Sequence, residues 1–183
     1  MKLLVSPAKS LNYESPLPHA TCSQPIFVQE AITLNTALRK KSPAELKELM
    51  GISDKLAELN WTRNQGFSVP FTADNARPAV YAFDGDVYTG LDAYTIEEGK
   101  WDTLNNSLRI LSGLYGVLKP FDLMQPYRLE MSTSFSVNGS KNLYGFWRDK
   151  ITSQLNLELQ TDECVVNLAS KEYASAVSLN DLD

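Results

Sequence analysis

The sequence predicts a mixed α/β fold, in which one domain forms a mostly buried sheet surrounded by helices. Three short apolar runs, residues 2–5, 79–83 and 164–168, have the length and composition of buried strands. Amphipathic segments with helical spacing lie between them. The chain has 183 residues, of which 43% are hydrophobic. A domain of this size buries about 70% of the surface that its unfolded chain exposes, so residues 1–183 are assigned to a single domain.

Net charge and cysteine content indicate which partners and which cellular compartment to expect. The formal net charge is −5, so no general attraction to nucleic acid or acidic membranes is expected and any basic surface must be local. Cys22 and Cys164 are far apart and follow no secretion signal, which indicates reduced thiols in the cytosol. No apolar run approaches the length of a membrane span. These features predict a soluble cytoplasmic protein without a membrane partner.

Several kinds of chemistry have no support in the sequence. His19 is the one histidine, and with two separated cysteines it supplies no zinc or iron–sulfur ligand set. No Walker-type phosphate loop, dinucleotide-binding fingerprint or nucleophile elbow is present. We therefore predict no metal and no cofactor. An enzyme built from this chain would have to use Lys, Arg, Asp, Glu and Tyr side chains.

Helices are predicted from apolar spacing and capping signals. Phe27, Ala31, Leu34 and Leu38 recur at intervals of about one turn, which predicts a helix from residue 25 to about residue 41. The sequence Ser-Pro-Ala-Glu at residues 42–45 is a capping box with proline in the first turn. A third helix is predicted over residues 142–159, with most of its apolar side chains inward: Leu143, Phe146, Trp147, Ile151, Leu155 and Leu157.

The segment around Gly51 allows two interpretations. Its pattern of an apolar residue, Gly51 and Ile52 is that of the helix-hairpin-helix motif, although Ser53 replaces the motif's second glycine. Such a hairpin directs backbone N–H groups at a phosphate of DNA, and Lys55 would add a positive charge. The first interpretation is therefore a DNA-binding site at Gly51, Ile52, Ser53 and Lys55. The second is an ordinary pair of helices in which Ser53 is the N-cap.

Residues 108–131 combine an apolar composition with repeated breaks, two of them at Gly113 and Gly116. A segment both apolar and punctuated is predicted to be a buried crossover whose turns position Tyr127, Arg128 and Glu130. The alternating pattern at residues 128–131 is typical of a strand, which would direct Arg128 and Glu130 to the same side. This charged pair is either a structural salt bridge or part of a polar pocket.

Polar turns follow each of the three predicted strands. Lys9 follows the first, Asp84 and Asp86 the second, and Lys171 the third. If the strands are parallel neighbours, their carboxyl ends share one crevice. We then expect a polar pocket built from Lys9, Asp86, Tyr88, Arg128, Glu130 and Lys171. The alternatives stay open: lysines in loops are often only solvated, and aspartates are common turn formers.

Five stretches resemble the YaaA family of bacterial peroxide-stress proteins. They are SPAKSLNYESP, ISDKLAELN, FDGDVYTGLDA, SGLYGVLKPFDLMQPYRLEM and NLASKEYASAV, and together they span nearly the whole chain. Two features depart from the family. Asp84 stands where members usually carry a basic residue, and the family's Lys/Arg-rich segment beyond NLASKEY is absent. The chain therefore resembles a C-terminally truncated member.

The resemblance implies a cytosolic protein that limits free intracellular iron and oxidative damage and binds DNA through a helix-hairpin-helix. Contacts to phosphates would make binding to duplex DNA independent of sequence. The alternative is an enzyme that acts on a small, nucleotide-like molecule in the polar pocket, through acid–base chemistry or a lysine nucleophile. Truncation is expected to expose an apolar patch or a strand edge, which predicts self-association.

Overall fold

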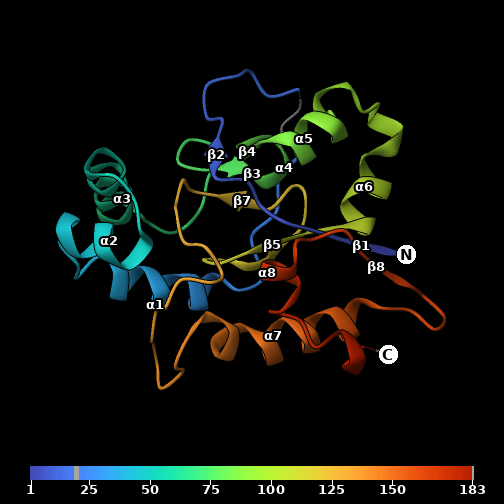
Figure 1. The fold of residues 1–183 in the computed structure, drawn as a ribbon. Helices are drawn as coiled ribbons and strands as arrows, with labels where there is room; N and C mark the ends of the chain where they lie inside the picture. The colour runs from blue at the N-terminus through green and yellow to red at the C-terminus, as the bar shows by residue number, and fades with distance from the viewer. Residues whose placement is uncertain (19–20, 183) are drawn as a thin grey trace.

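The computed structural model describes residues 1–18 and 21–182, so His19 lies outside the described residues (Figure 1). Its central sheet has the strand order β6-β5-β1-β8. The strands are β1 (Lys2–Val5), β5 (Leu108–Ser112), β6 (Gly116–Leu118) and β8 (Val165–Asn167). β1 runs parallel to both β5 and β8, whereas β6 is antiparallel to β5. The predicted mixed α/β fold is confirmed.

Two short antiparallel ladders lie outside this sheet. β2 (Ser10–Leu11) pairs with β4 (Phe83–Asp84). β3 (Arg77–Pro78) pairs with β7 (Leu123–Met124). Each ladder connects segments that are far apart in the sequence, so both depend on the folded core that holds those segments together.

The prediction of a strand over residues 79–83 is wrong. Residues Ala79–Ala82 form a single helical turn, α4, between the short strands β3 and β4. All four residues are buried: Ala79 and Ala82 pack in the main core, while Val80 and Tyr81 pack with Phe121 in a second cluster. A short run that is buried on every side carries no periodicity, so its composition suits a strand and a helix equally well.

Helices lie on both sides of the central sheet. In Figure 1, α7 (Leu143–Glu158) runs along one side, and α4, α5 (Asp86–Leu91) and α6 (Trp101–Ser107) lie on the other. The predicted helix over residues 142–159 is confirmed, with Asn142 as its N-cap. Leu157 is an exception to its inward face, because it is 83% exposed. In residues 1–18 and 21–182, no helix is both long and apolar enough to cross a membrane.

The remaining short elements are η1 (Ala93–Thr95), η2 (Glu98–Lys100), α8 (Lys171–Ala174) and η3 (Leu179–Asp181). α8 begins after the three residues 168–170 that follow β8, as the polar strand-to-helix turn there predicted. β8 itself was expected to be buried, and that expectation is wrong. Val165 and Val166 are only partly buried and Asn167 is exposed, because β8 is an edge strand of the sheet.

A compact pair of helices forms one end of the molecule next to α1 (Val28–Leu38). The pair consists of α2 (Pro43–Met50) and α3 (Asp54–Gly66), called here the helical hairpin. The predicted capping box is present: the Glu45 N–H donates to Ser42 Oγ at 3.3 Å, and the Ser42 N–H donates to the Glu45 carboxylate at 2.8 Å. Gly51 ends α2 in the left-handed region, at φ 60°, where glycine avoids the strain that a Cβ introduces.

Residues 108–131, called here the central segment, form the most buried stretch of the chain. They supply β5, β6 and β7, and all are buried except Lys119, Pro126, Arg128 and Glu130. The predicted buried segment is therefore confirmed. The strand expected at residues 128–131 is not formed: residues 125–130 lie in no regular element.

Candidate functional site

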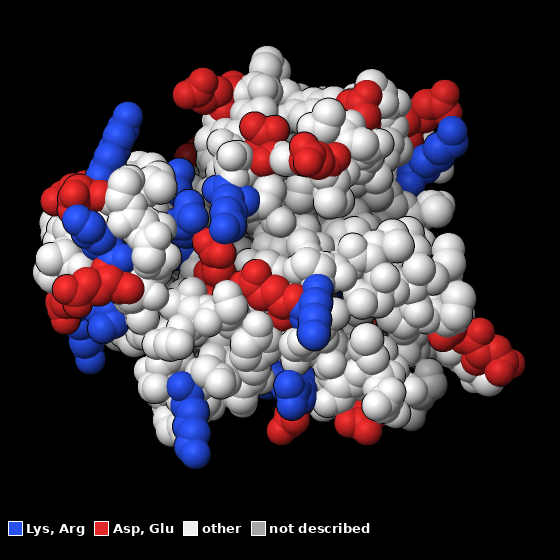
Figure 2. Space-filling model, viewed as in Figure 1, with Lys and Arg blue, Asp and Glu red and all other residues white. Residues whose placement is uncertain are grey.

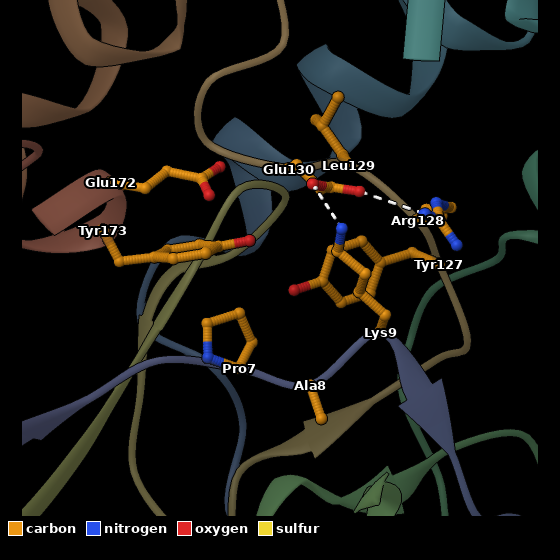
Figure 3. A pocket seen from close by; sticks show the side chains of 9 residues that line it. All are labelled: Pro7, Ala8, Lys9, Tyr127, Arg128, Leu129, Glu130, Glu172 and Tyr173. Carbon is orange, nitrogen blue, oxygen red and sulfur yellow. Dashed lines mark hydrogen bonds and ion pairs between the residues drawn. The ribbon is translucent and has the colours of Figure 1, made fainter. Parts of the chain in front are cut away.

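A small depression opens at the carboxyl ends of β1 and β8 (Figure 3). Its volume is about 70 Å³. Three parts of the chain build it: the loop after β1, the segment after β7, and the first turn of α8. Its lining residues are Pro7, Ala8, Lys9, Tyr127, Arg128, Leu129, Glu130, Glu172 and Tyr173. This is the edge of a parallel sheet at which α/β proteins bind ligands.

Glu130 is the centre of the charged groups in this depression. Its Oε2 lies 3.0 Å from Lys9 Nζ, and its Oε1 accepts a hydrogen bond from Arg128 Nη2 at 3.1 Å. Lys9 is 66% exposed, so its ion pair is worth little in water and can be opened at small cost. Arg128 is mostly buried, and its Nε has no hydrogen-bond partner among the residues that the structure describes. The arrangement places one exposed and one mostly buried cation beside a shared carboxylate.

Two tyrosines supply neutral hydroxyl groups at the depression. Burial raises the pKa of Tyr127 well above its ordinary value, and its hydroxyl lies 2.6 Å from Ser112 Oγ. Burial also raises the pKa of Tyr173, and Tyr127 and Glu172 add to that shift. Both side chains therefore stay protonated at neutral pH. They can donate hydrogen bonds to a ligand, but they cannot act as bases.

Glu172 is oriented by the loop that follows the central segment. Its Oε1 accepts hydrogen bonds from the Ser132 N–H at 2.9 Å and from Ser132 Oγ at 2.8 Å. The carboxylate therefore has a defined position at the side of the depression opposite Arg128 (Figure 3). With Lys9, Arg128, Glu130 and Glu172, the lining carries two positive and two negative side chains. A ligand here would meet balanced charge.

Gly113 allows the wall of the depression to approach the end of β5. A Cβ on Gly113 would overlap the carbonyl oxygen of Leu129. Because that oxygen belongs to the backbone, a side chain at Gly113 could be accommodated only if the segment moved. The lack of a Cβ is thus what places Leu129 and its neighbours Arg128 and Glu130 over the sheet edge.

The structure brings together only part of the predicted polar pocket. Lys9, Arg128 and Glu130 meet, whereas Asp86 and Lys171 are not among the residues that line the depression. Asp86 is exposed at the start of α5. It was expected at the same edge, but the preceding strand β4 belongs to a separate antiparallel ladder. The assumption that all three strands are parallel neighbours was wrong.

Lys171 and Tyr88 have other surroundings. Lys171 lines a separate depression with Arg148 and Asn167. Tyr88 is buried, and its hydroxyl donates a hydrogen bond to the carbonyl of Ser6 at 3.0 Å. Tyr88 therefore supports the loop that carries Lys9, without lining the depression itself.

Several residues at and beside the depression were missed in the sequence. Glu172 and Tyr173 line it, and a signal was available, because both belong to the NLASKEY stretch. Tyr13 and Arg63 line an adjoining groove of about 520 Å³. Burial is the main cause that lowers the pKa of Arg63, and the positive charge of Arg128 lowers it further. Arg63 lies on α3, so only tertiary structure brings it near Arg128.

The residues of the helical hairpin that were predicted to contact DNA differ in their exposure to solvent. Gly51, Ser53 and Lys55 are exposed, while Ile52 is 8% exposed and packs inward. The Leu56 N–H donates to Ser53 Oγ at 3.4 Å, so the N-cap interpretation of Ser53 is confirmed. Acidic and basic side chains alternate over this end of the molecule (Figure 2). One such pair, Lys47 Nζ and Asp54 Oδ1, lies 2.8 Å apart and links α2 to α3.

Relatives with similar sequences extend beyond this chain. It is 59% identical over 182 residues to a UPF0246 protein of Flavobacterium johnsoniae, an alignment that covers 100% of this chain and 72% of the relative. It is 53% identical to a UPF0246 protein of Flavobacterium psychrophilum, with the same coverage. A UPF0246 protein of Hahella chejuensis is 52% identical over 97% of this chain and 70% of its own length.

A family model agrees with these relatives over the full length of the chain. The model is described as peroxide stress protein YaaA, and it matches residues 1–183. The match includes the loop after β1, the central segment and α8, which together form the depression. The resemblance inferred from the five sequence stretches is confirmed, and the chain belongs to the YaaA family of peroxide stress proteins.

Proposed function

We propose that this protein acts in the cytoplasm during peroxide stress by binding duplex DNA without sequence preference, and that it thereby limits oxidative damage and free iron. Membership of the peroxide stress family supports the cellular role. The geometry of the helical hairpin supports the proposed binding of duplex DNA. The chain as a whole carries a charge of −5, so binding has to depend on local features of the surface.

The observation that carries the proposal is the turn between α2 and α3. Gly51 adopts φ 60° and ψ 43°, and α3 begins three residues later. This tight turn exposes the backbone beside the amino end of a 13-residue helix, where the helix dipole favours a phosphate. Lys55 is exposed in the first turn of α3. A contact of this kind reads the DNA backbone and is insensitive to base sequence.

A second feature is a group of basic side chains beside the hairpin. Basic side chains gather where α3 faces the rest of the molecule (Figure 2). Arg63 of α3 lies in the groove next to the depression that Arg128 and Lys9 line. The groove is lined by Arg63 together with the carboxylates of Glu14 and Asp84, so a phosphate of a duplex held at the hairpin would have to approach Arg63, where one further contact would raise affinity and its salt dependence.

The test is a salt-titrated binding assay with fluorescent duplexes of unrelated sequence. Lys55→Glu is expected to weaken binding equally for all duplexes and to reduce the salt slope by about one. Gly51→Val should also weaken binding, because valine is strained at a positive φ. Lys100→Glu is the matched control: Lys100 is exposed and pairs with Glu97 at 3.5 Å. It ends η2 directly before α6, and α6 lies at the other end of the molecule from the hairpin (Figure 1).

If Lys55→Glu and Lys100→Glu have the same effect on affinity, net charge alone governs binding and the hairpin has no special role. Undiminished affinity in both Lys55→Glu and Gly51→Val would likewise remove the hairpin from the proposal. The effect on iron is tested separately in peroxide-treated cells, by electron paramagnetic resonance of chelated free iron. Cells that express this chain should contain less free iron than cells with an empty vector, and equal signals would remove iron from the proposal.

A second candidate function is the binding of a small, nucleotide-like ligand at the depression. The observation that favours it is the cluster of Lys9, Arg128 and Glu130 beside the protonated Tyr173. A volume of about 70 Å³ is far below that of ordinary ligand pockets, so only a group the size of one phosphate would enter. The rest of such a ligand would lie in the adjoining groove. Lys9 and Glu130 form the pair through which a proton could be exchanged.

Calorimetric titration with nucleoside mono-, di- and triphosphates tests this candidate. Lys9→Met should reduce affinity at least about tenfold if Lys9 contacts the phosphate, whereas Lys100→Met should not change it. Absence of heat with every nucleotide would eliminate this candidate and leave the DNA proposal untouched.

A further inference from the structure

We propose that the groove between α3 and the β2–β4 ladder binds a small zwitterion, a molecule that carries both a carboxylate and an ammonium group. The groove has a volume of about 520 Å³, which is in the range of sites that hold a whole small molecule. Arg63 of α3, Asp84 of β4 and Glu14 all line it, together with the apolar Leu11 and Pro126. Side chains of both charge signs therefore lie along one groove.

Arg63 supplies the positive charge. It is partly buried, and its Nη1 donates to Asn60 Oδ1 at 3.3 Å. In residues 1–18 and 21–182, it forms an ion pair with no carboxylate. Burial lowers the pKa of Arg63, and the positive charge of Arg128 lowers it further. A carboxylate bound at Arg63 would offset both effects, and the planar guanidinium can hold both of its oxygens at once.

Glu14 and Asp84 supply the negative charge. Both are exposed, and neither forms an ion pair within the described part of the chain. Asp84 belongs to β4, and the pairing of β4 with β2 holds its backbone. The Glu14 N–H donates to Asn12 Oδ1 at 3.0 Å, which holds the backbone of the second carboxylate. An ammonium group has three donors, so one such group can be shared by both carboxylates.

The separation of these charges favours a zwitterion over a simple ion. Arg63 lies in the same groove as the two carboxylates but more than 4.0 Å from their oxygens, so the charges do not neutralise each other by direct contact. An anion at Arg63 is repelled by the carboxylates, and a cation at the carboxylates is repelled by Arg63. A ligand with one charge of each sign avoids both repulsions. Tyr13 also lines the groove and adds no charge, because its hydroxyl donates to the Met124 carbonyl at 2.7 Å and burial raises its pKa.

An NMR titration of the full chain with ligands of different charge tests the proposal. The zwitterions are glycine, glycylglycine and 6-aminohexanoate, which differ in the distance between their charges, whereas acetate and ethylammonium carry one charge each. At least one zwitterion should bind with a Kd of about 1 mM or tighter, and about tenfold or more tighter than either singly charged ion. The amide signals of residues 11–15 and of Arg63 should shift as it binds.

Substitutions at both ends of the groove locate the site. Asp84→Asn removes a negative charge, and Arg63→Lys keeps the positive charge but loses the planar fork; each should weaken binding of that zwitterion about tenfold. The matched control is Asp102→Asn, because Asp102 is exposed in the first turn of α6, at the other end of the molecule from α3 (Figure 1). This variant should bind as the unchanged chain does. Melting temperatures of all three variants separate lost binding from unfolding.

Three results would overturn the proposal. Equal affinity for acetate and for the best zwitterion would show a simple anion site at Arg63. Signals that do not saturate with any of the zwitterions up to about 50 mM would show that no such site exists. An Asp84→Asn variant that binds the zwitterion undiminished would remove the carboxylates from it. The DNA proposal is independent of all three, because loss of the Asp84 charge removes no phosphate contact and should not weaken duplex binding.

Discussion

The helical hairpin and the central segment are stabilised in different ways. In the hairpin, the amino ends of α2 and α3 are capped by side chains three residues away: Ser42 Oγ accepts from the Glu45 N–H and Ser53 Oγ accepts from the Leu56 N–H. In the central segment, the important contacts join distant parts of the chain: the Trp147 indole N–H donates to the Gly113 carbonyl at 2.9 Å, and Gly113 abuts Leu129. A locally capped element tolerates change better than one whose conformation depends on remote packing.

The largest difference is expected between two glycine substitutions. Gly113→Ala places a Cβ against the Leu129 carbonyl, and we expect a loss of about 3 kcal/mol or more in the free energy of unfolding. Gly51→Ala meets no atom within 4 Å and should cost only about 1 kcal/mol, the strain of a left-handed residue. Urea denaturation measures both. Equal losses would show that the central segment is no less tolerant than the hairpin.

Alkaline pH should affect the central segment before the hairpin. Burial raises the pKa of the tyrosines in and around that segment, namely Tyr13, Tyr88, Tyr115, Tyr127 and Tyr173. A raised pKa in the folded state means that stability is fully present below the unfolded-state pKa near 10 and is lost as pH rises above it. Tyrosine absorbance should therefore report cooperative ionisation with unfolding above about pH 10. Independent ionisation of these tyrosines in a folded chain would contradict the prediction.

Removal of one hydroxyl group tests how much a single hydrogen bond beneath the depression contributes to stability. Tyr127→Phe leaves Ser112 Oγ without its 2.6 Å partner in a buried site, and we expect a cost of about 1–2 kcal/mol. Thermal and urea unfolding both measure it. Tyr144→Phe is a suitable control, because Tyr144 lies outside the central segment and is less buried. A larger loss for Tyr144→Phe would argue against this role of the Ser112–Tyr127 pair.

The smallest effect is expected at the cap of α2. Ser42→Ala removes the acceptor for the Glu45 N–H and should destabilise the chain by about 1 kcal/mol. The Ser42 N–H and hydroxyl also lower the pKa of Glu45. A carboxyl group whose pKa is lowered in the folded state stabilises that state at pH values above its unfolded-state pKa. This stability is lost as the pH falls through the folded-state pKa. The cost of Ser42→Ala should therefore shrink below about pH 4, and a cost independent of pH would exclude this coupling.

Capping signals, which depend on only a few neighbouring residues, predicted the helix ends accurately. Ser42, Gly51 and Ser53 mark the helix ends where the structure has them. The same sequence reasoning was wrong at residues 79–83, because a short apolar run has no period that distinguishes a buried helical turn from a strand. It was also wrong about Asp86, because strand pairing between distant segments decides which turns share an edge of the sheet.

By itself, the sequence determined the α/β class, the capped helices, the buried nature of residues 108–131 and the family. These features depend on composition, on periodicity within one element, or on similarity along the chain. Tertiary structure alone decided that Lys9 and Glu130 meet Glu172 and Tyr173, that Arg63 approaches Arg128, and that β8 lies at the edge of the central sheet. The physical reason is that such contacts depend on strand order and on close approaches such as Gly113 to Leu129, and no local pattern of residues encodes either.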